Sequence, residues 1–378
     1  MYSARWPNWR FNADENASHF RRLTWALGLV GSAMPTRIVA KSILGRLALN
    51  PDDEDGDLAY LEEIVAFWAR QDDCIATRWA SHDGCDVVVR FDWSPVSPIL
   101  SQQLLMSKLL RHSPRELPPD WWEAYSKEVV IPVTVEIDGR NKLSKHDWYP
   151  DFFIENALFD LFTVVNLALP SAADFNDLRL EQTGPTPHDP LSLSAYYLDD
   201  YFARKLPWPK LTRIDVEVVD RWYKRVRNGV GQVPETPVER AIFALWHVCR
   251  SSGRPEDIVW IFFGFESLFQ TRTGENFNAL LDRITLLLRP SDEQIKLLKK
   301  QLRSMYDHRS SFVHGGLQVI HPSHSDSIDP RAQAKYSDIV DLSVFGTRLL
   351  VACLQRYVTE NWRAVAFKTS IEPSNDEA

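Results

Sequence analysis

The stretch "MYDHRSSFVHGG", residues 305–316, gathers side chains that could act as nucleophile, base and anion binder. At about 100° per helical residue, Asp307, Ser310 and His314 share one face, as the members of a hydrolase triad would. A catalytic serine needs an exposed turn and an oxyanion hole beside it. Ser310 lies in the middle of the predicted helix without either feature, so the sequence argues against a serine hydrolase.

Arg309 interrupts the apolar face of the same predicted helix, residues 291–314. The rest of that face is aliphatic or aromatic and comprises Ile295, Leu298, Leu302, Met305 and Phe312. An arginine there costs free energy unless a carboxylate, a phosphate or water meets it. Glu266 is the only acid in the apolar segment "IFFGFESLFQ" and is the expected partner. A structural Arg309–Glu266 pair is at least as strong an interpretation as a catalytic one.

The opposite face of this helix is largely basic, with Lys296, Lys300 and Arg303 followed by Asp307, Ser310 and His314. Such a stripe is most often a solvated surface. A histidine at a helix C-terminus commonly interacts with the last carbonyl groups and with the helix dipole. Ser291 with Gln294 predicts a capping box at the start of the helix, and Gly315 predicts its end.

Two segments of the chain resemble the HEPN superfamily, and most closely its Apea-like group. Members carry a Tyr-x-x-Arg-Ser-x-x-x-His-Gly pattern near the end of a long bundle helix, matched here by Tyr306, Arg309, Ser310, His314 and Gly315. The upstream "FFGFESLFQ", with Phe265, Glu266, Leu268 and Phe269, is similar to an apolar helix of the family. The resemblance concerns residues 212–366 and says nothing of residues 1–200.

The resemblance implies a metal-independent endoribonuclease without a cofactor, which acts on RNA as a homodimer. Arg309 would hold the phosphate, and His314 would move protons while the RNA 2′-hydroxyl attacks. Supporting residues would be Glu266, Tyr306, Ser310 and Asp307, and Lys296, Lys300 and Arg303 would guide RNA. Family analogy adds a role as a toxin or antiviral (phage-defence) effector, with a trigger or regulatory protein as a further partner. The alternative is a non-catalytic HEPN module for dimerisation or ligand binding.

The elements that must position these residues form an expected α+β chain. Periodicity predicts helices over 14–48 and 57–70, a helix after Pro98 and an apolar helix ended by Pro170. Turn residues and alternation predict a β-hairpin around Asp83-Gly84 and a strand through "EVVIPVTVEIDGRN". We expect a mixed α/β domain over 1–175, as sensor or regulator, and an all-α HEPN-like bundle over 212–366. Loops over 171–211 with a short helix at 195–204 should join them, and a flexible tail over 367–378 should follow the bundle. The connector proper, rich in Pro, Ser and Asp, spans 176–211.

Composition is that of an ordinary globular protein, with 44% hydrophobic and 25% charged residues among 378. The net charge of −8 means that a polyanion would have to bind to a local basic patch. No apolar run reaches the length of a membrane helix and no secretion signal is visible, so we expect a cytoplasmic protein. Four scattered cysteines fit a reducing compartment, and the trio Cys74, His82 and Cys85 is a weak basis for a metal site.

Overall fold

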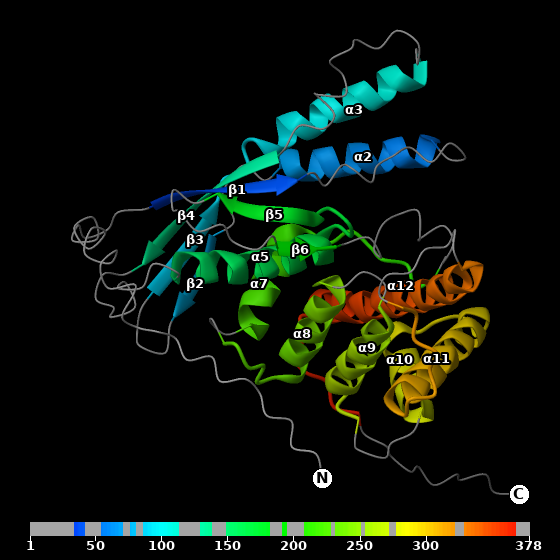
Figure 1. The fold of residues 1–378 in the computed structure, drawn as a ribbon. Coiled ribbons are helices and arrows are strands. Elements are labelled where there is room, and N and C mark those ends of the chain that lie inside the picture. Colours follow the sequence, from blue (N-terminus) through cyan, green and yellow to red (C-terminus); the bar gives the residue numbers. More distant parts are fainter. Residues whose placement is uncertain are drawn as a thin grey trace, which may run out of the picture.

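The chain is α+β in the computed structural model, with a sheet and its helices in the N-terminal half and helices alone in the C-terminal half (Figure 1). The structure describes residues 34–41, 54–70, 76–80, 86–112, 129–137, 149–181, 191–194, 208–227, 231–250, 254–271, 277–321 and 329–367. The predicted metal trio of Cys74, His82 and Cys85 and the predicted helix at 195–204 lie outside these ranges.

The elements of the N-terminal half alternate between strands and helices. They are β1 (Met34–Lys41), α2 (Glu54–Ala69), β2 (Ala76–Ala80), β3 (Asp86–Phe91), α3 (Val96–His112), β4 (Val129–Ile137), α5 (Tyr149–Ala168), β5 (Phe175–Glu181) and β6 (Leu191–Leu193). The predicted helix over 57–70, the hairpin strands, the helix near Pro98, the strand that became β4 and the apolar helix α5 are confirmed.

The strands form one antiparallel sheet in the order β2-β3-β4-β1-β5-β6. Alternate residues of β4 are buried, namely Val129, Ile131, Val133 and Val135, whereas those between them are more exposed. In Figure 1, α2 and α3 lie side by side beyond one face of the sheet, and α5 lies between the sheet and the C-terminal helices. The helix α5 therefore connects the two halves of the molecule.

Two sequence-based expectations for this half were wrong. Residues 34–41, inside the predicted helix 14–48, form β1, which pairs with β4 on one side and β5 on the other. The predicted loops over 171–211 contain β5 and β6. Both errors have a common cause, because β1 and β5 form by pairing between segments far apart in the chain, which overrides weak local preference. The strand β6 then adds to the edge of β5. The boundaries proposed for the domains stay a prediction.

The C-terminal half is helical, as predicted for the residues from about 212 onward. Its described helices are α7 (Val216–Val226), α8 (Pro237–Arg250), α9 (Pro255–Leu268), α10 (Phe277–Leu288), α11 (Asp292–Val313) and α12 (Pro330–Thr359). The long helix α12 crosses the others and contacts α7, α8, α9, α10 and α11. In Figure 1, α9 lies between α8 and the α10–α11 pair. No described helix is long and apolar enough to cross a membrane.

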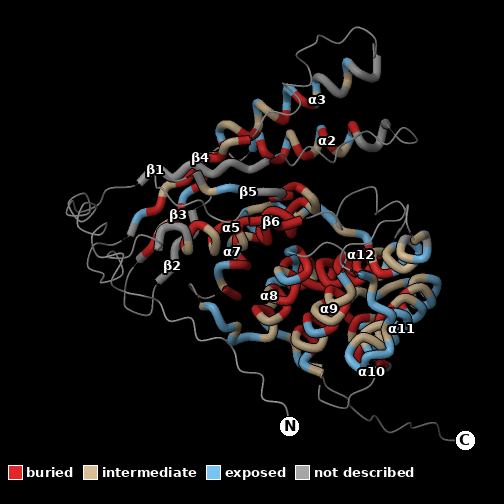
Figure 2. The backbone as a smooth tube through the Cα atoms, viewed as in Figure 1, coloured by how far each residue is buried: buried red, intermediate tan, exposed pale blue. Residues whose placement is uncertain are grey.

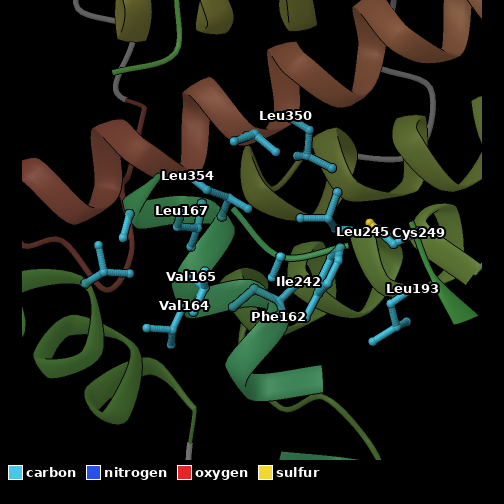
Figure 3. Packing of buried hydrophobic residues seen from close by; sticks show 14 of the residues in the cluster. Phe162, Val164, Val165, Leu167, Leu193, Ile242, Leu245, Cys249, Leu350 and Leu354 are labelled. Carbon is cyan, nitrogen blue, oxygen red and sulfur yellow. The ribbon is translucent and has the colours of Figure 1, made fainter. Parts of the chain in front are cut away.

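One hydrophobic core extends through both halves. Figure 3 shows Phe162, Val164, Val165 and Leu167 of α5 beside Leu193 of β6, Ile242, Leu245 and Cys249 of α8, and Leu350 and Leu354 of α12. In Figure 2 the buried backbone runs from the sheet through α5 into α8, α9 and α12, whereas α10 and α11 carry more exposed positions. The sheet and the helical half are thus packed against each other by apolar side chains.

A buried ion pair accompanies this core. The Arg227 side chain is 3% exposed, and its Nε lies 3.3 Å from Oδ1 of Asp160, which is 4% exposed. The hydroxyl of Tyr223 donates to the same oxygen at 2.6 Å. Burial and the Asp160 carboxylate raise the pKa of Tyr223 well above its usual value, so the phenol stays protonated. The sequence analysis missed this cluster, which joins α5 of the N-terminal half to the end of α7.

Candidate functional site

The helix α11 begins and packs as its sequence predicts. The Ser291 side chain accepts from the Gln294 backbone, and the Gln294 side chain accepts from the Ser291 N–H, which is the predicted capping box. Leu298, Leu302 and Met305 are buried and form the inner stripe of the helix. The apolar face thus holds α11 against its neighbours up to the position of Arg309.

Arg309 pairs with Glu266 through two parallel contacts. Its Nη1 lies 3.1 Å from Oε1 and its Nη2 lies 3.2 Å from Oε2 of the carboxylate. The two side chains are 31% and 38% exposed, so water still reaches the pair. The guanidinium carbon also lies 5.5 Å from the ring centroid of Phe262. The expected Arg309–Glu266 pair is therefore confirmed, and a guanidinium with five N–H groups keeps further donors beyond the two used here.

Tyr306 belongs to the aromatic packing beside this pair. Its ring meets those of Phe262 and Phe277 edge to face, each at 6.1 Å between centroids. The Arg303 guanidinium carbon lies over the ring of Phe277, 4.7 Å from its centroid. Phe262 therefore contacts both Tyr306 and Arg309, and the aromatic rings fix the direction in which α9 presents Glu266 to α11.

The glycines of "HGG" end the helix. His314 is the C-cap residue, and Gly315 adopts the left-handed conformation with φ of 72°. The Gly316 N–H donates to the Ser311 carbonyl at 2.8 Å, and the Gly315 N–H donates to the Phe312 carbonyl at 3.3 Å. These two bonds are those of a Schellman motif. The predicted end of the helix at Gly315 is confirmed, and the glycines have a structural reason to be there.

The other predicted site residues are on the surface. Asp307, Ser310 and His314 are exposed, as are Lys296, Lys300 and Arg303. Five residues of α-helix separate Arg309 from His314 by about 7.5 Å of rise and about 140° of rotation. The structure thus brings together Arg309 and Glu266, with Tyr306 behind them, and leaves His314 on another side of the helix in a single chain.

His308 is a site residue that sequence reasoning missed. It is half-buried, and its ring donates a hydrogen bond to the backbone carbonyl of Pro255 at the start of α9. Its Nε2 atom is buried without a hydrogen-bond partner among the described residues. Burial lowers the pKa of His308 from its ordinary value, so the ring is neutral. His308 thus secures the α11 end to α9 beside Arg309; its only signal in sequence was its place next to that arginine.

Within the described residues, no group of three or more His, Cys, Asp or Glu side chains could hold a metal ion. Cys249 and Cys353 are buried and unbridged, and burial raises the pKa of both thiols, so neither resembles a reactive nucleophile.

Comparisons with protein-family models, with curated proteins and with solved structures found no match to this chain.

Proposed function

We propose that the chain is a metal-independent endoribonuclease of the HEPN type. The observation that carries the proposal is the state of Arg309: its guanidinium is oriented by Glu266 and Phe262, yet a third of the side chain is exposed. A guanidinium held in place with donors still available is suited to a phosphate. His314 is exposed at the end of the same helix, and an imidazole serves as general base or general acid.

The proposed reaction needs two copies of the chain. Since Arg309 and His314 point apart on one helix, a two-fold contact between the ends of two α11 helices would assemble the site. Val313 precedes His314 and Val319 follows it by five residues in the chain. The two valines are 60% and 65% exposed, which supports a contact at this end of α11. Apolar side chains of this kind at the centre of a contact would be covered by the second copy.

Each step of the chemistry has a residue for it. The 2′-oxygen of the RNA forms a bond to the adjacent phosphorus while the bond from phosphorus to the 5′-oxygen breaks. His314 of one copy takes the 2′-hydroxyl proton, and His314 of the other copy gives a proton to the departing oxygen. Arg309 stabilises the charge that grows on the phosphate oxygens. The products are a 2′,3′-cyclic phosphate and a 5′-hydroxyl.

The surrounding residues have secondary roles in this proposal. Glu266 and Tyr306 orient Arg309, while Lys296, Lys300 and Arg303 attract the RNA backbone. Asp307 and Ser310 lie on the exposed face next to His314. The N-terminal sheet half would respond to a trigger or a regulatory protein, and release of the nuclease would act as a toxin or as antiviral defence. That biological role comes from family analogy.

The test is cleavage of a labelled RNA by purified wild type, Arg309→Ala and His314→Ala, with Lys299→Ala as an exposed control on the same helix. We expect both site variants to lose at least about a hundredfold in rate, in line with removal of a general acid–base group. The control should keep the wild-type rate. Cleavage of a fully 2′-deoxy strand at the same rate, or unchanged cleavage by His314→Ala, would refute the proposed chemistry.

A second candidate is a non-catalytic HEPN scaffold, and two observations favour it. The Arg309–Glu266 pair accounts for the arginine, and the Schellman motif accounts for the glycines, without any reaction. If the protein is such a scaffold, neither the wild type nor His314→Ala cleaves RNA. Sedimentation of wild type beside Val313→Asp would then report whether the α11 end forms a dimer.

A further inference from the structure

A set of aromatic side chains on α8 and α9 has no role in the proposed reaction. His247 of α8 stacks flat on Trp260 of α9, with ring centroids 4.0 Å apart and an interplanar angle of 8°. Phe263 meets Trp260 edge to face at 6.2 Å. We call His247, Trp260 and Phe263 the aromatic surface. His247 is exposed and Phe263 is 41% exposed, so this stack of rings faces outward.

Phe263 connects the aromatic surface to Glu266, the partner of Arg309. Trp260, Phe263 and Glu266 follow one another at intervals of three residues, so each is a neighbour of the next, and the row turns by about 120° around α9. Glu266 in turn holds Arg309. The rise from Trp260 to Glu266 is about 9 Å. A strand that reaches the Arg309 guanidinium therefore meets Phe263 first and winds around α9 to Trp260 and His247.

Arg250 borders the rings at the other end, and Arg254 lies with its partner Glu256 at the start of α9. Arg250 is exposed and lies three residues beyond His247, one helical turn away. Arg254 is 66% exposed at the start of α9 and lies 3.8 Å from Glu256. Trp260 covers one face of the otherwise exposed His247 ring, and this partial burial, followed by the charge of Arg250, lowers the pKa of His247. A flat ring beside an exposed guanidinium matches a nucleobase joined to a phosphate.

We infer that the aromatic surface binds the bases of a single-stranded RNA whose backbone continues to Arg309. One base extends the stack on His247 and Trp260, a neighbouring base contacts Phe263, and Arg250 meets the phosphate. Stacking on aromatic rings with cations beside the backbone is the general means of holding single strands without sequence preference. The inference rests on the proposed function in one respect, namely that RNA is the ligand of Arg309.

A second copy of the chain fits this surface less well than RNA. A two-fold contact centred on the rings would bring Arg250 of one copy close to Arg250 of the other. Like charges facing each other across an interface cost several kcal/mol. A polyanion gains from the same cations. The charge around the rings therefore favours a nucleic acid strand.

The test measures binding without cleavage. Full-length protein is titrated into a fluorescent 2′-O-methyl RNA strand of about twelve nucleotides, a length within the usual range for single-strand sites. We expect His247→Leu to bind about tenfold more weakly and His247→Phe, which keeps a ring, to bind like wild type. Leu286→Ala is the control, since Leu286 is 67% exposed on α10 away from the rings. Arg250→Gln should reduce the slope of log affinity against log salt by about one.

A second strand isolates the bases. The same length of abasic backbone keeps its phosphates, so it should bind wild type and His247→Leu with equal, reduced affinity. Equal binding of the normal strand by wild type and His247→Leu overturns the inference. So does a change of sedimentation in His247→Leu with unchanged RNA binding, because the rings would then belong to a contact between copies.

The proposed nuclease and this surface can fail separately. Because the 2′-O-methyl strand lacks the attacking hydroxyl, its binding to the wild type and to the ring variants is measured independently of cleavage. If RNA binding depends on the rings but unmodified RNA is not cleaved, the aromatic surface is supported and the proposed nuclease is refuted. If RNA is cleaved but its binding does not depend on the rings, the proposed nuclease is supported and the aromatic surface is refuted as a binding site.

Discussion

Two arginines of this protein have the same kinds of partner and opposite exposures. Arg227 pairs with Asp160 and lies over the rings of Phe243 and Trp246 at 5.1 and 5.3 Å. Arg309 pairs with Glu266 and lies 5.5 Å from the ring of Phe262. The first pair is 3% and 4% exposed, whereas the second is 31% and 38% exposed.

The difference in exposure decides what each arginine can do. Arg227 is enclosed between α5, α7 and α8, and it also donates to the Gly231 carbonyl at 2.9 Å, so no ligand can reach it. Arg309 is at the end of a helix, where a ligand can add to its remaining donors. An arginine with a carboxylate partner is thus evidence for a site only when solvent reaches it as well.

The largest expected effect comes from breaking the buried pair. Arg227→Met removes the cation and leaves the Asp160 charge in a nonpolar environment, which typically destabilises a protein by about 3–5 kcal/mol. Urea denaturation followed by circular dichroism measures the loss. The triple variant Arg227→Met, Asp160→Leu, Tyr223→Phe removes charges and hydroxyl together and should recover most of the stability. A cost below about 1 kcal/mol for Arg227→Met would contradict the structural role.

Local sequence could predict one of these pairs and not the other. Glu266 was the only acid in the apolar segment 261–270 and Arg309 the only cation on an apolar face, so each stood out and implied the other. Asp160 and Arg227 are 67 residues apart, and Arg227 follows a helix with several cations. Which of several charges is buried depends on how α5 and α7 pack, and periodicity contains no such information.

The same limit explains the rest of the comparison between sequence and structure. The helices of the C-terminal half and the caps of α11 were predictable because their signals are local. The strands β1 and β5 were missed because each is made by partners far along the chain. His308 and the stack of His247 on Trp260 depend on the approach of two helices, so neither could be seen before the structure.

A smaller effect is expected from the exposed pair. In a double-mutant cycle of Arg309→Gln and Glu266→Gln, the coupling energy should be below about 1 kcal/mol, as for other solvent-accessible ion pairs. The matching cycle of Arg227→Gln and Asp160→Asn should give a clearly larger value. Urea denaturation of the wild type, the four single variants and the two double variants supplies both numbers. A coupling above about 2 kcal/mol for Arg309 would place it with the core pairs and would favour the scaffold over the nuclease.

The smallest effect concerns His308, the neighbour of Arg309 that has lost contact with water at Nε2. Its pKa in the folded protein is lowered by burial, so the unfolded chain binds a proton more readily below about pH 6.5. The stability that neutral His308 contributes is present above that pH and is lost as the pH falls toward the folded value. The urea midpoint of wild type should therefore drop between pH 7.5 and 5.5, and that of His308→Asn should drop less. If the urea midpoints of the two proteins fall in parallel with pH, the His308 ring is protonated as easily in the folded chain as in water. That result would contradict a neutral His308 contact between α11 and α9.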